Sequence, residues 1–514
     1  MAARWCFLSH WRDVEFMNKL FRGLFLLGVL GLVLGVIALL GARSSSRGAL
    51  RSYEAELRAK GERLTLAELS HGRWTNGIDS YAVITNAVAR LGDARLNAGL
   101  LEPRRYLRPG QAIEVWREPD LRWLKPAASG KGGTWEEFDA QTQAARGILQ
   151  EIREALREPA LDAGPYTNVL VSRRVNFVAI RKAAHWLVGA VENDLHQGRL
   201  GEALQNLEAL AALARMERDE CTLVAQMIRV AVAGLGLSVT WDALQATGWT
   251  EPQLERLQRA WEPVDLVEAV QRGFVGERAG GYELFARLRR ASGPHAGRLF
   301  PIVIGGSSSS LQKTFAEVVT DYLYFPAYKL TCIDEDELFY LRCMQESLAP
   351  LRLLKAHRPW AEAKQGSAAA IARLTKAGSS PRRYRYFVSM MAIPNFARAG
   401  ERAVQVETER QMTRAAIALK RFQLRHGNLP PSLEALVPDF LAAVPFDYMS
   451  AKPVRYRTGS DGSYVIYSVG DDGKDDGGDP SPASGQPSGL WTGRDALWPS
   501  PADVTGNAAP QPGS

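Results

Sequence analysis

A run of twenty residues without a charged side chain, Gly23–Ala42, constrains this chain more than any other stretch. Arg22 and Arg43 flank the run on either side. As a helix that rises about 1.5 Å per residue, the run is long enough to cross a hydrocarbon core of roughly 30 Å. A helix satisfies its own backbone hydrogen bonds, so an apolar helix is stable in lipid. The run therefore predicts a transmembrane anchor over residues 22–43, after a short cytoplasmic tail over residues 1–21.

A cleaved signal peptide and a buried core helix are the alternatives to an anchor. The run is longer than the apolar core of about 7–15 residues that signal peptides carry. The basic residues on its two sides are nearly balanced, so the orientation rests on the short tail and the large C-terminal body. We expect a single-pass protein of the bacterial inner membrane whose body faces the periplasm. Gly31 and Gly35 have the spacing that lets two such helices approach closely, although glycine is also common in membrane helices generally.

The bulk composition is that of a globular protein and disfavours nucleic-acid binding. The chain has 514 residues, enough for several domains, and a formal net charge of +7. Its basic residues are spread among acidic ones rather than gathered in a block with aromatic residues, so we expect no nucleic-acid partner. Cys332 and Cys343 are close enough in sequence for a disulfide in an exported body, or they are packed as free thiols.

The sequence offers no catalytic or cofactor-binding motif. Its seven histidines are scattered, and neither the H-E-x-x-H nor the G-x-S-x-G pattern occurs. A stretch around Lys131 lacks the first glycine of a phosphate-binding loop. We therefore assign no catalytic residue and expect a protein that is not an enzyme.

The central part of the chain, residues 134–400, reads as an irregular α-helical body. It follows a mixed juxtamembrane region over residues 44–133, in which Ser52–Ser70 has helical spacing. Within the body, apolar periodicity and capping residues predict helices over Gln141–Leu156, Asn176–His196, Leu200–Met216, Cys221–Trp241 and Thr250–Arg259. Arg229 lies in the middle of Cys221–Trp241, which favours a buried helix there over a second membrane span.

An acidic run, Asp334-Glu335-Asp336-Glu337, precedes a predicted helix over Leu338–Leu348. Negative charge is favourable at the positive end of a helix dipole, which gives the run a structural role. A metal site or an acid/base site is the alternative. The helix is expected to end before Pro350, because proline disfavours a helical conformation in the residue that precedes it.

The last hundred residues change in character. Val404–His426 is an amphipathic helix that ends at Gly427, and Ser432 caps a short helix over Leu433–Val437. The β-rich runs Val454–Thr458 and Tyr464–Val469 are joined by a turn rich in glycine, which predicts a hairpin. The fold class is therefore mainly α, with a small α+β region over residues 401–480. Residues 481–514 are rich in Pro, Gly and Ser and are expected to be largely disordered.

This order of parts resembles the globular head of the major pseudopilin of type II secretion systems. The matching stretches are Ala416–Gly427, Leu429–Pro445 and Tyr464–Gly478. In that family the loop after the last of these strands binds calcium. Carried over by position, the resemblance implies calcium ligands at the carbonyl of Val469 and the side chains of Ser468, Asp472, Asp475 and Asp476. Calcium prefers six to eight oxygen ligands, and clustered carboxylates repel each other without a cation. A solvated acidic turn is the alternative.

One departure from the family changes the expected role. A pseudopilin carries its hydrophobic segment directly at the base of the head helix, whereas here Gly23–Ala42 lies far upstream and contains no glutamate. We therefore expect a pseudopilin-like head attached to a different membrane protein, neither processed nor polymerised. The predicted function is a protein-interaction or structural component of a secretion or pilus-like system. The alternatives are an exported hydrolase that uses Glu335 and Glu337, and a calcium-stabilised scaffold or sensor.

Overall fold

The computed structural model describes residues 41–69, 80–91, 105–118, 134–159, 176–291, 320–393, 398–459, 462–482 and 487–502, together with Leu30 and Leu34. These residues are mainly helical, with small sheets that involve the C-terminal part of the chain. They form two compact units. The first unit takes in residues up to Leu64, Gly281–Arg342 and Thr375–Ala392; the second takes in Thr65–Gly280, Cys343–Leu374 and the residues from Ile393 on.

The first unit is built from short and long helical segments around aromatic side chains. A helix over residues 41–59 contributes Tyr53, whose ring lies 5.5 Å from the guanidinium carbon of Arg342. Phe285 and Tyr340 are buried with their ring centroids 5.8 Å apart. A Cβ atom at Gly281 would lie 2.3 Å from the Tyr340 ring, so only glycine allows the ring to pack there. The unit's elements are the end of α11 (Leu266–Arg290), η4 (Thr320–Tyr324), α13 (Phe325–Thr331), the start of α14 (Ile333–Lys355), the end of α15 (Trp360–Ser379), η5 (Pro381–Tyr386) and α16 (Phe387–Ala392).

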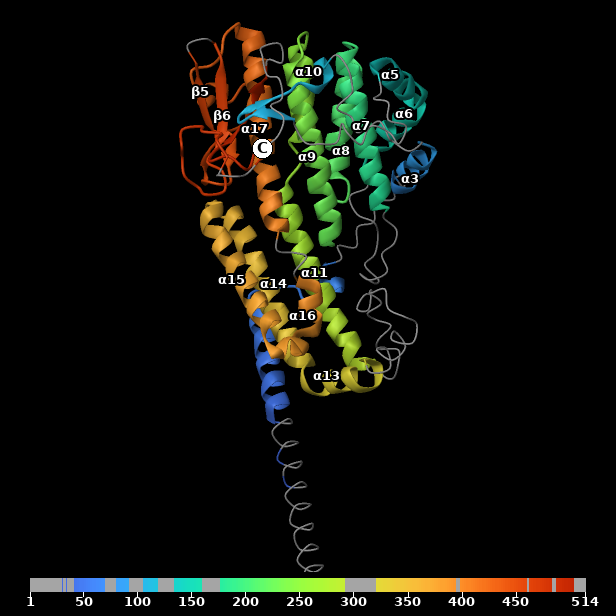
Figure 1. Cartoon of the computed structure of the whole chain (residues 1–514), viewed down its shortest axis with the longest axis vertical. Coiled ribbons are helices and arrows are strands. Elements are labelled where there is room, and N and C mark those ends of the chain that lie inside the picture. Colours follow the sequence, from blue (N-terminus) through green and yellow to red (C-terminus); the bar gives the residue numbers. More distant parts are fainter. Residues whose placement is uncertain are drawn as a thin grey trace, which may run out of the picture. The chain divides into compact units, whose positions relative to one another are not determined.

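The second unit is organised around α9 (Leu223–Gln245). The helices α7 (Phe177–His196) and α8 (Leu200–Arg215) pack on α9, and α17 (Ala399–His426) packs on it from the other side (Figure 1). Among the described residues, α9 is the helix long and apolar enough to cross a membrane, yet 67% of its most apolar stretch is buried inside the protein. Arg229 is buried within it, where its Nε donates to the carbonyl oxygen of Ala214 and its Nη1 to Gln226. The prediction of a core helix is thus consistent with these contacts.

Shorter helices cover this group. The helix α10 (Glu251–Trp261) contacts α8 and α17, and α3 (Ser80–Arg90) contacts α6 (Arg146–Ala155) and α7. The remaining helical elements of the unit are α2 (Leu66–Leu69), η1 (Val115–Arg117), α5 (Trp135–Ala144) and η7 (Leu433–Leu436), with parts of α11, α14 and α15.

The strands of the second unit form three small sheets. In the largest of its antiparallel pairings, β5 (Arg455–Thr458) lies beside β6 (Tyr464–Ser468), as the hairpin prediction requires, and β7 (Ala496–Leu497) pairs with the other edge of β6. A second sheet joins β1 (Tyr106–Arg108), β2 (Gln111–Ala112) and β8 (Ser500–Pro501), and a third joins β3 (Phe446–Asp447) and β4 (Lys452–Pro453). The strand β6 packs on α17 (Figure 1).

Several local predictions are confirmed. The predicted helix over Asn176–His196 is α7, and Thr250 stands as the predicted N-cap before α10. The structure adds a side-chain cap at Asn176 and a capping box between Thr250 and Gln253. Gly427 ends α17 in the left-handed conformation, with φ of 76°. The described residues of the chain are mainly α-helical, as expected, with strands near the C-terminus.

Other local predictions are wrong. Ser52–Ser70 is not one helix, because the helix over residues 41–59 ends in a turn at Gly61 and α2 starts only at Leu66. Gln141–Leu156 divides at Ala145 into α5 and α6. Helix α14 does not end before Pro350, which lies inside it. The burial of Leu348, Leu351 and Leu354 compensates for the hydrogen bond that the proline removes.

The C-terminal tail also differs from its prediction in the part that the structure describes. Residues 487–502 hold β7 and β8, and Ala496 and Trp498 are buried. Residues 401–480 fall in the same compact unit as most of the helical body, rather than in a unit of their own. The predicted anchor, including Gly31 and Gly35, lies outside the described residues except for Leu30, Leu34 and residues 41–43.

Candidate functional site

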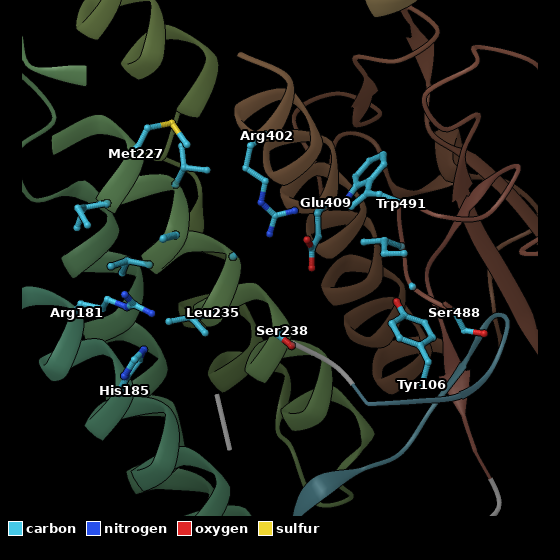
Figure 2. A pocket seen from close by; sticks show the side chains of 17 residues that line it. Tyr106, Arg181, His185, Met227, Leu235, Ser238, Arg402, Glu409, Ser488 and Trp491 are labelled. Carbon is cyan, nitrogen blue, oxygen red and sulfur yellow. The ribbon is translucent and has the colours of Figure 1, made fainter. Parts of the chain in front are cut away.

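A cavity of about 670 Å³ lies between α7, α9, α17 and the C-terminal segment. Figure 2 shows Arg181 and His185 on α7 on one side of it, with Arg402 and Glu409 on α17 and Trp491 of the C-terminal segment on the other. Its volume lies within the range of about 300–1,000 Å³ that small-molecule sites occupy. The cavity is thus large enough for a ligand and is bounded by segments that are far apart in the sequence.

The floor of the cavity is one apolar face of α9. Met227, Ala231 and Leu235 follow one another at intervals of four residues and line it together. Gly234 lies on the same face, and a Cβ atom there would be 3.6 Å from Nη2 of Arg402. The missing side chain at this position leaves space beside the guanidinium.

Charged and polar groups stand at the walls. Burial and the charge of the neighbouring Arg181 lower the pKa of His185 to about 4, so this imidazole is neutral at pH 7. Arg402 makes one long hydrogen bond, of 3.5 Å, from its Nη1 to Oε1 of Gln405. The indole Nε1 of Trp491 is buried and has no hydrogen-bond acceptor among the described residues. These groups are available to a ligand inside the cavity.

The wall formed by the C-terminal segment is held in place by long-range hydrogen bonds. Nε1 of Trp241 on α9 donates to the carbonyl oxygen of Pro499 over 2.8 Å. The backbone N–H of Trp498 donates to Ile466 and that of Ala502 to Ala112, over 2.9 and 2.8 Å. The segment is therefore an integral part of the second unit.

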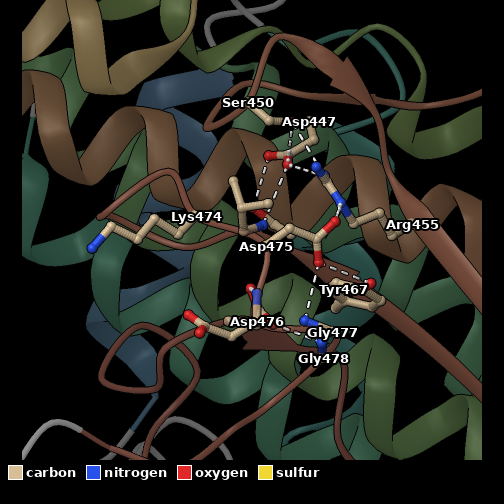
Figure 3. Close-up of polar contacts among 12 residues, drawn as sticks. Asp447, Ser450, Arg455, Tyr467, Lys474, Asp475, Asp476, Gly477 and Gly478 are labelled. Atoms are coloured by element: carbon tan, nitrogen blue, oxygen red, sulfur yellow. Dashed lines mark hydrogen bonds and ion pairs between the residues drawn. The ribbon is translucent and has the colours of Figure 1, made fainter.

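Two of the residues predicted to bind calcium, Ser468 and Val469, contact the buried Asp447, and Figure 3 shows Asp447 with Arg455 and Asp475 beside it. The carboxylate of Asp447 accepts hydrogen bonds from the hydroxyl of Ser468 at 2.7 Å and from the backbone N–H of Val469 at 3.4 Å. Asp475 lies further out and is exposed; its carboxylate accepts hydrogen bonds from Nε of Arg455 at 2.6 Å and from the hydroxyl of Tyr467 at 3.1 Å. Two of the predicted ligands, Ser468 and Asp475, are thus already engaged by protein groups.

The other two predicted carboxylates do not complete a coordination shell. Asp472 accepts a hydrogen bond from the backbone N–H of Lys474 in a local turn, and both Asp472 and Asp476 are exposed. Partial desolvation raises the pKa of Asp475, but the hydrogen bonds from Arg455 and Gly477 outweigh it and leave that pKa below its ordinary value. Among the described residues, no group of three or more His, Cys, Asp or Glu is arranged to hold a metal ion.

The residues present therefore do not fit calcium in this arrangement. Arg455 supplies a positive charge between Asp447 and Asp475, at 3.3 and 2.6 Å from their carboxylate oxygens. The guanidinium thus already neutralises the two carboxylates that a bound cation would otherwise neutralise. Calcium binding, which the resemblance implies for this loop, is therefore not expected in this arrangement of side chains.

The acidic run at the start of α14 is held by contacts within the first unit. Asp336 is buried and accepts hydrogen bonds from the hydroxyl of Tyr328 and from the backbone N–H of Val388, over 2.7 and 2.9 Å. Glu335 accepts from the hydroxyl of Tyr386 over 2.9 Å. Arg289 pairs with the carboxylates of Asp334 and Glu337.

Burial raises the pKa of two carboxyl groups of this run, those of Asp336 and Glu337. It raises the pKa of Asp336 to about 6 in spite of the hydrogen bonds from Ser389, Tyr328 and Val388. It raises the pKa of Glu337 to about 7 in spite of the positive charge of Arg289. The side chains fasten α14 to its neighbours, which is the structural role that the sequence favoured.

A second hollow, of about 730 Å³, lies between α6, α8 and α10 and is lined by several arginines. Arg256 forms a two-point ion pair with Glu208 there, at 3.0 and 2.7 Å. Arg153 lies 3.5 Å from Glu202 and 3.1 Å from the side-chain oxygen of Asn206. Arg256 and Arg153 are thus paired within the protein.

The chain matches no protein-family model, no curated protein and no solved structure. The site therefore has to be interpreted from its own chemistry.

Sequence reasoning missed both Asp447 and the cavity. Asp447 is an isolated acidic residue at the end of the short strand β3, and its partners Arg455 and Ser468 follow at intervals of eight and 21 residues. The cavity combines Tyr106 with Arg181, Arg402 and Trp491. The one local sequence signal for the cavity is the composition of α9. This helix is apolar on all sides, whereas a surface helix has a polar face.

Proposed function

We propose that this chain is a protein-binding or structural component of the bacterial envelope, anchored in the inner membrane by Gly23–Ala42, with its body in the periplasm. Its C-terminal part would serve a secretion or pilus-like apparatus as a fixed adaptor, without catalysis. The observation that carries the proposal is the burial of α17, the helix of the pseudopilin-like part, within the helical body.

The burial of α17 includes a pair of charges. Arg410 and Glu407 lie 2.6 Å apart, and their side chains are 6% and 1% exposed. Nη1 of Arg410 also donates to the carbonyl oxygen of Trp261 over 2.8 Å, and Glu407 accepts from the backbone N–H of Leu266 over 3.1 Å. Glu407 and Arg410 lie on the same helix and pair with each other, so removing α17 from the body would break the two hydrogen bonds to Trp261 and Leu266. A helix held in this way supports a fixed adaptor rather than a polymerising subunit.

An exposed apolar helical face supports a location at the membrane surface. Tyr322, Leu323, Pro326, Ala327 and Leu330 are exposed along η4 and α13, at spacings that place them on one side of a helix. Leu323 is 68% exposed and Leu330 is 58% exposed. Tyrosine at the rim of an apolar surface is typical of a membrane interface. We take the lipid surface as the partner of this face.

The connection to the predicted anchor favours lipid over another protein. The helix over residues 41–59 follows the predicted anchor in the sequence and belongs to the same unit as α13. Glu54 in this helix is close enough to Arg289 and Asp334 for their charges to affect its pKa. At about 1.5 Å per residue, Glu54 lies about 18 Å from the end of the anchor at Ala42. Asp334 follows α13 by three residues, so α13 lies within about one helix length of the membrane.

The adaptor role can be tested by crosslinking in membranes. A chain cut before α17 would lose part of its core, so the test uses full-length protein with a photoreactive residue at Leu424, which is 48% exposed near the end of α17. The matched control carries the residue at Val224, which is 55% exposed on α9. Crosslinks from Leu424, but not from Val224, to secretion or pilus-like components are expected. An identical set of partners from both positions, or none from Leu424, would contradict the proposal.

A further inference from the structure

The cavity between α7, α9 and α17 has an apolar floor and a basic rim, a combination that the proposed adaptor role does not use. We propose that it binds an acyl chain with a single negative charge at its head, either a free fatty acid or a single-chain acidic phospholipid. The acidic head would lie at Arg181 and Arg402, and the chain would lie along α9.

The charges in the cavity fit an anion with one negative charge. Arg181 and Arg402 contribute two positive charges, and the carboxylate of Glu409 contributes one negative charge. His185 is neutral at pH 7, because burial and the charge of Arg181 lower its pKa. The sum leaves one positive charge for the ligand to neutralise in a partly desolvated space, where a charge-assisted hydrogen bond is stronger than in water.

The shape and polarity of the walls fit a chain. Met227, Ala231 and Leu235 give a continuous apolar strip along one face of α9. Trp491 faces this strip from the C-terminal segment (Figure 2) and brings a buried N–H without an acceptor among the described residues. A linear apolar chain would cover the strip, and an oxygen at its head or along it would satisfy a donor.

The position of Trp491 provides a direct readout. Full-length protein kept in an amphipathic polymer is titrated with a long-chain fatty acid that carries bromine, which quenches tryptophan emission at short range. The same titration of Trp491→Phe measures the quenching that comes from the other tryptophans and from non-specific partition of the fatty acid. This background is subtracted from the quenching of the wild-type protein. The expected result is saturable quenching in the wild-type protein that is largely lost in Trp491→Phe. Native mass spectrometry of the same samples counts the bound molecules.

Arginine variants test the role of charge. Arg181→Gln and Arg402→Gln are each expected to weaken binding about tenfold or more, since each removes a charge-assisted hydrogen bond. Arg256→Gln, in the separate hollow between α8 and α10, is the matched control and leaves binding unchanged. An uncharged alcohol of equal chain length is expected to bind about tenfold more weakly than the acid. Gly234→Leu, which fills the space beside Arg402, abolishes binding.

The two sources of the acyl chain are separated by a parallel titration with a brominated lysophosphatidylglycerol. Stronger binding of this lipid assigns the site to membrane phospholipid, and stronger binding of the fatty acid assigns it to the free acid. Absence of quenching at Trp491 with both probes overturns the proposal. Equal affinity for the acid and the alcohol, or unchanged affinity in both arginine variants with an unchanged circular dichroism spectrum, also overturns it.

Discussion

The guanidinium of Arg455 lies 3.3 Å from the carboxylate of Asp447, whose side chain is completely buried. Arg455 also pairs with the exposed Asp475, so one cationic side chain neutralises two acidic residues of the loop region (Figure 3). A bound calcium ion would have to compete with this guanidinium for both carboxylates.

We therefore predict that calcium does not stabilise the wild-type protein. The melting temperature is expected to stay the same, within about 1 °C, in excess calcium and in chelator, because a ligand stabilises only the state that it binds. Differential scanning fluorimetry of the full chain measures it, with magnesium as the control ion. A rise of several degrees that is specific for calcium would show that the loop rearranges to bind the ion and would restore the calcium prediction.

The pair of Glu407 and Arg410 on α17 leads to a prediction on stability. Glu407→Gln leaves the buried Arg410 without its carboxylate and is expected to lower the free energy of unfolding by about 3–5 kcal/mol. Urea unfolding followed by circular dichroism measures the loss. The control is Arg358→Gln, which breaks an exposed pair with Glu362 and should cost about 0.5 kcal/mol or less. Similar losses in the free energy of unfolding in both variants would mean that the buried pair does not stabilise the protein more than an exposed pair does.

Stability should also depend on pH through Glu337. Its pKa is raised from an ordinary value of 4.5 to about 7, mainly by burial. The stability that the protonated form provides is therefore fully present below pH 4.5 and is lost as the pH rises through 7. At about 1.4 kcal/mol per pKa unit, the loss is about 3.5 kcal/mol at most.

Glu337→Gln imitates the protonated carboxyl and should remove this part of the pH dependence. Burial raises the pKa of Asp336 from 3.8 to about 6 with the same sign, so the variant keeps a smaller fall in stability that is complete near pH 6. Unfolding of both proteins at several pH values between 5 and 8 measures the difference. A variant that loses stability as steeply as the wild type between pH 6 and 7, where Asp336 no longer contributes, would exclude Glu337 as the cause.

Local physics explains which features of the fold could be predicted. The cap at Asn176 and the left-handed Gly427 depend on residues within one helical turn, so the sequence identifies them directly. Pro350 misleads for the opposite reason. Its helix-breaking effect is local, but the burial of Leu348 and Leu351 that compensates for it comes from tertiary packing.

Composition misleads in the tail as well. Its Pro, Gly and Ser content is typical of disorder, yet backbone hydrogen bonds from Trp498 to Ile466 and from Ala502 to Ala112 hold it in the second unit. The candidate site is tertiary throughout. Arg181 on α7 and Arg402 on α17 meet one cavity only because both helices pack on α9.

The cap at Gly427 offers a clean test of backbone conformation. No atom lies within 4 Å of the position that a Cβ would take, so Gly427→Ala acts through the left-handed φ of 76° alone. We expect the substitution to lower the free energy of unfolding by about 1 kcal/mol. A residue with a Cβ atom is less stable in the left-handed conformation by roughly 1–2 kcal/mol. Gly147→Ala, in α6 with equally open space and a helical backbone, should be neutral or stabilising by about 0.5–1 kcal/mol. Chemical unfolding measures both, and an equal loss of stability in Gly147→Ala would show that the left-handed φ is not the cause.

The exposed face of η4 and α13 should be in contact with lipid in the native membrane. Single cysteines that replace Leu323 and Leu330, in a full chain whose native cysteines are changed to serine, would carry nitroxide labels. If the face rests on the bilayer, both labels relax faster with oxygen, which concentrates in lipid, than with a water-soluble nickel complex. A label at Leu424 on α17 is the control and is expected to respond to nickel. Preferential nickel relaxation at both Leu323 and Leu330 would remove lipid as the partner of this face, because a side chain buried in the membrane interface is shielded from ions in water.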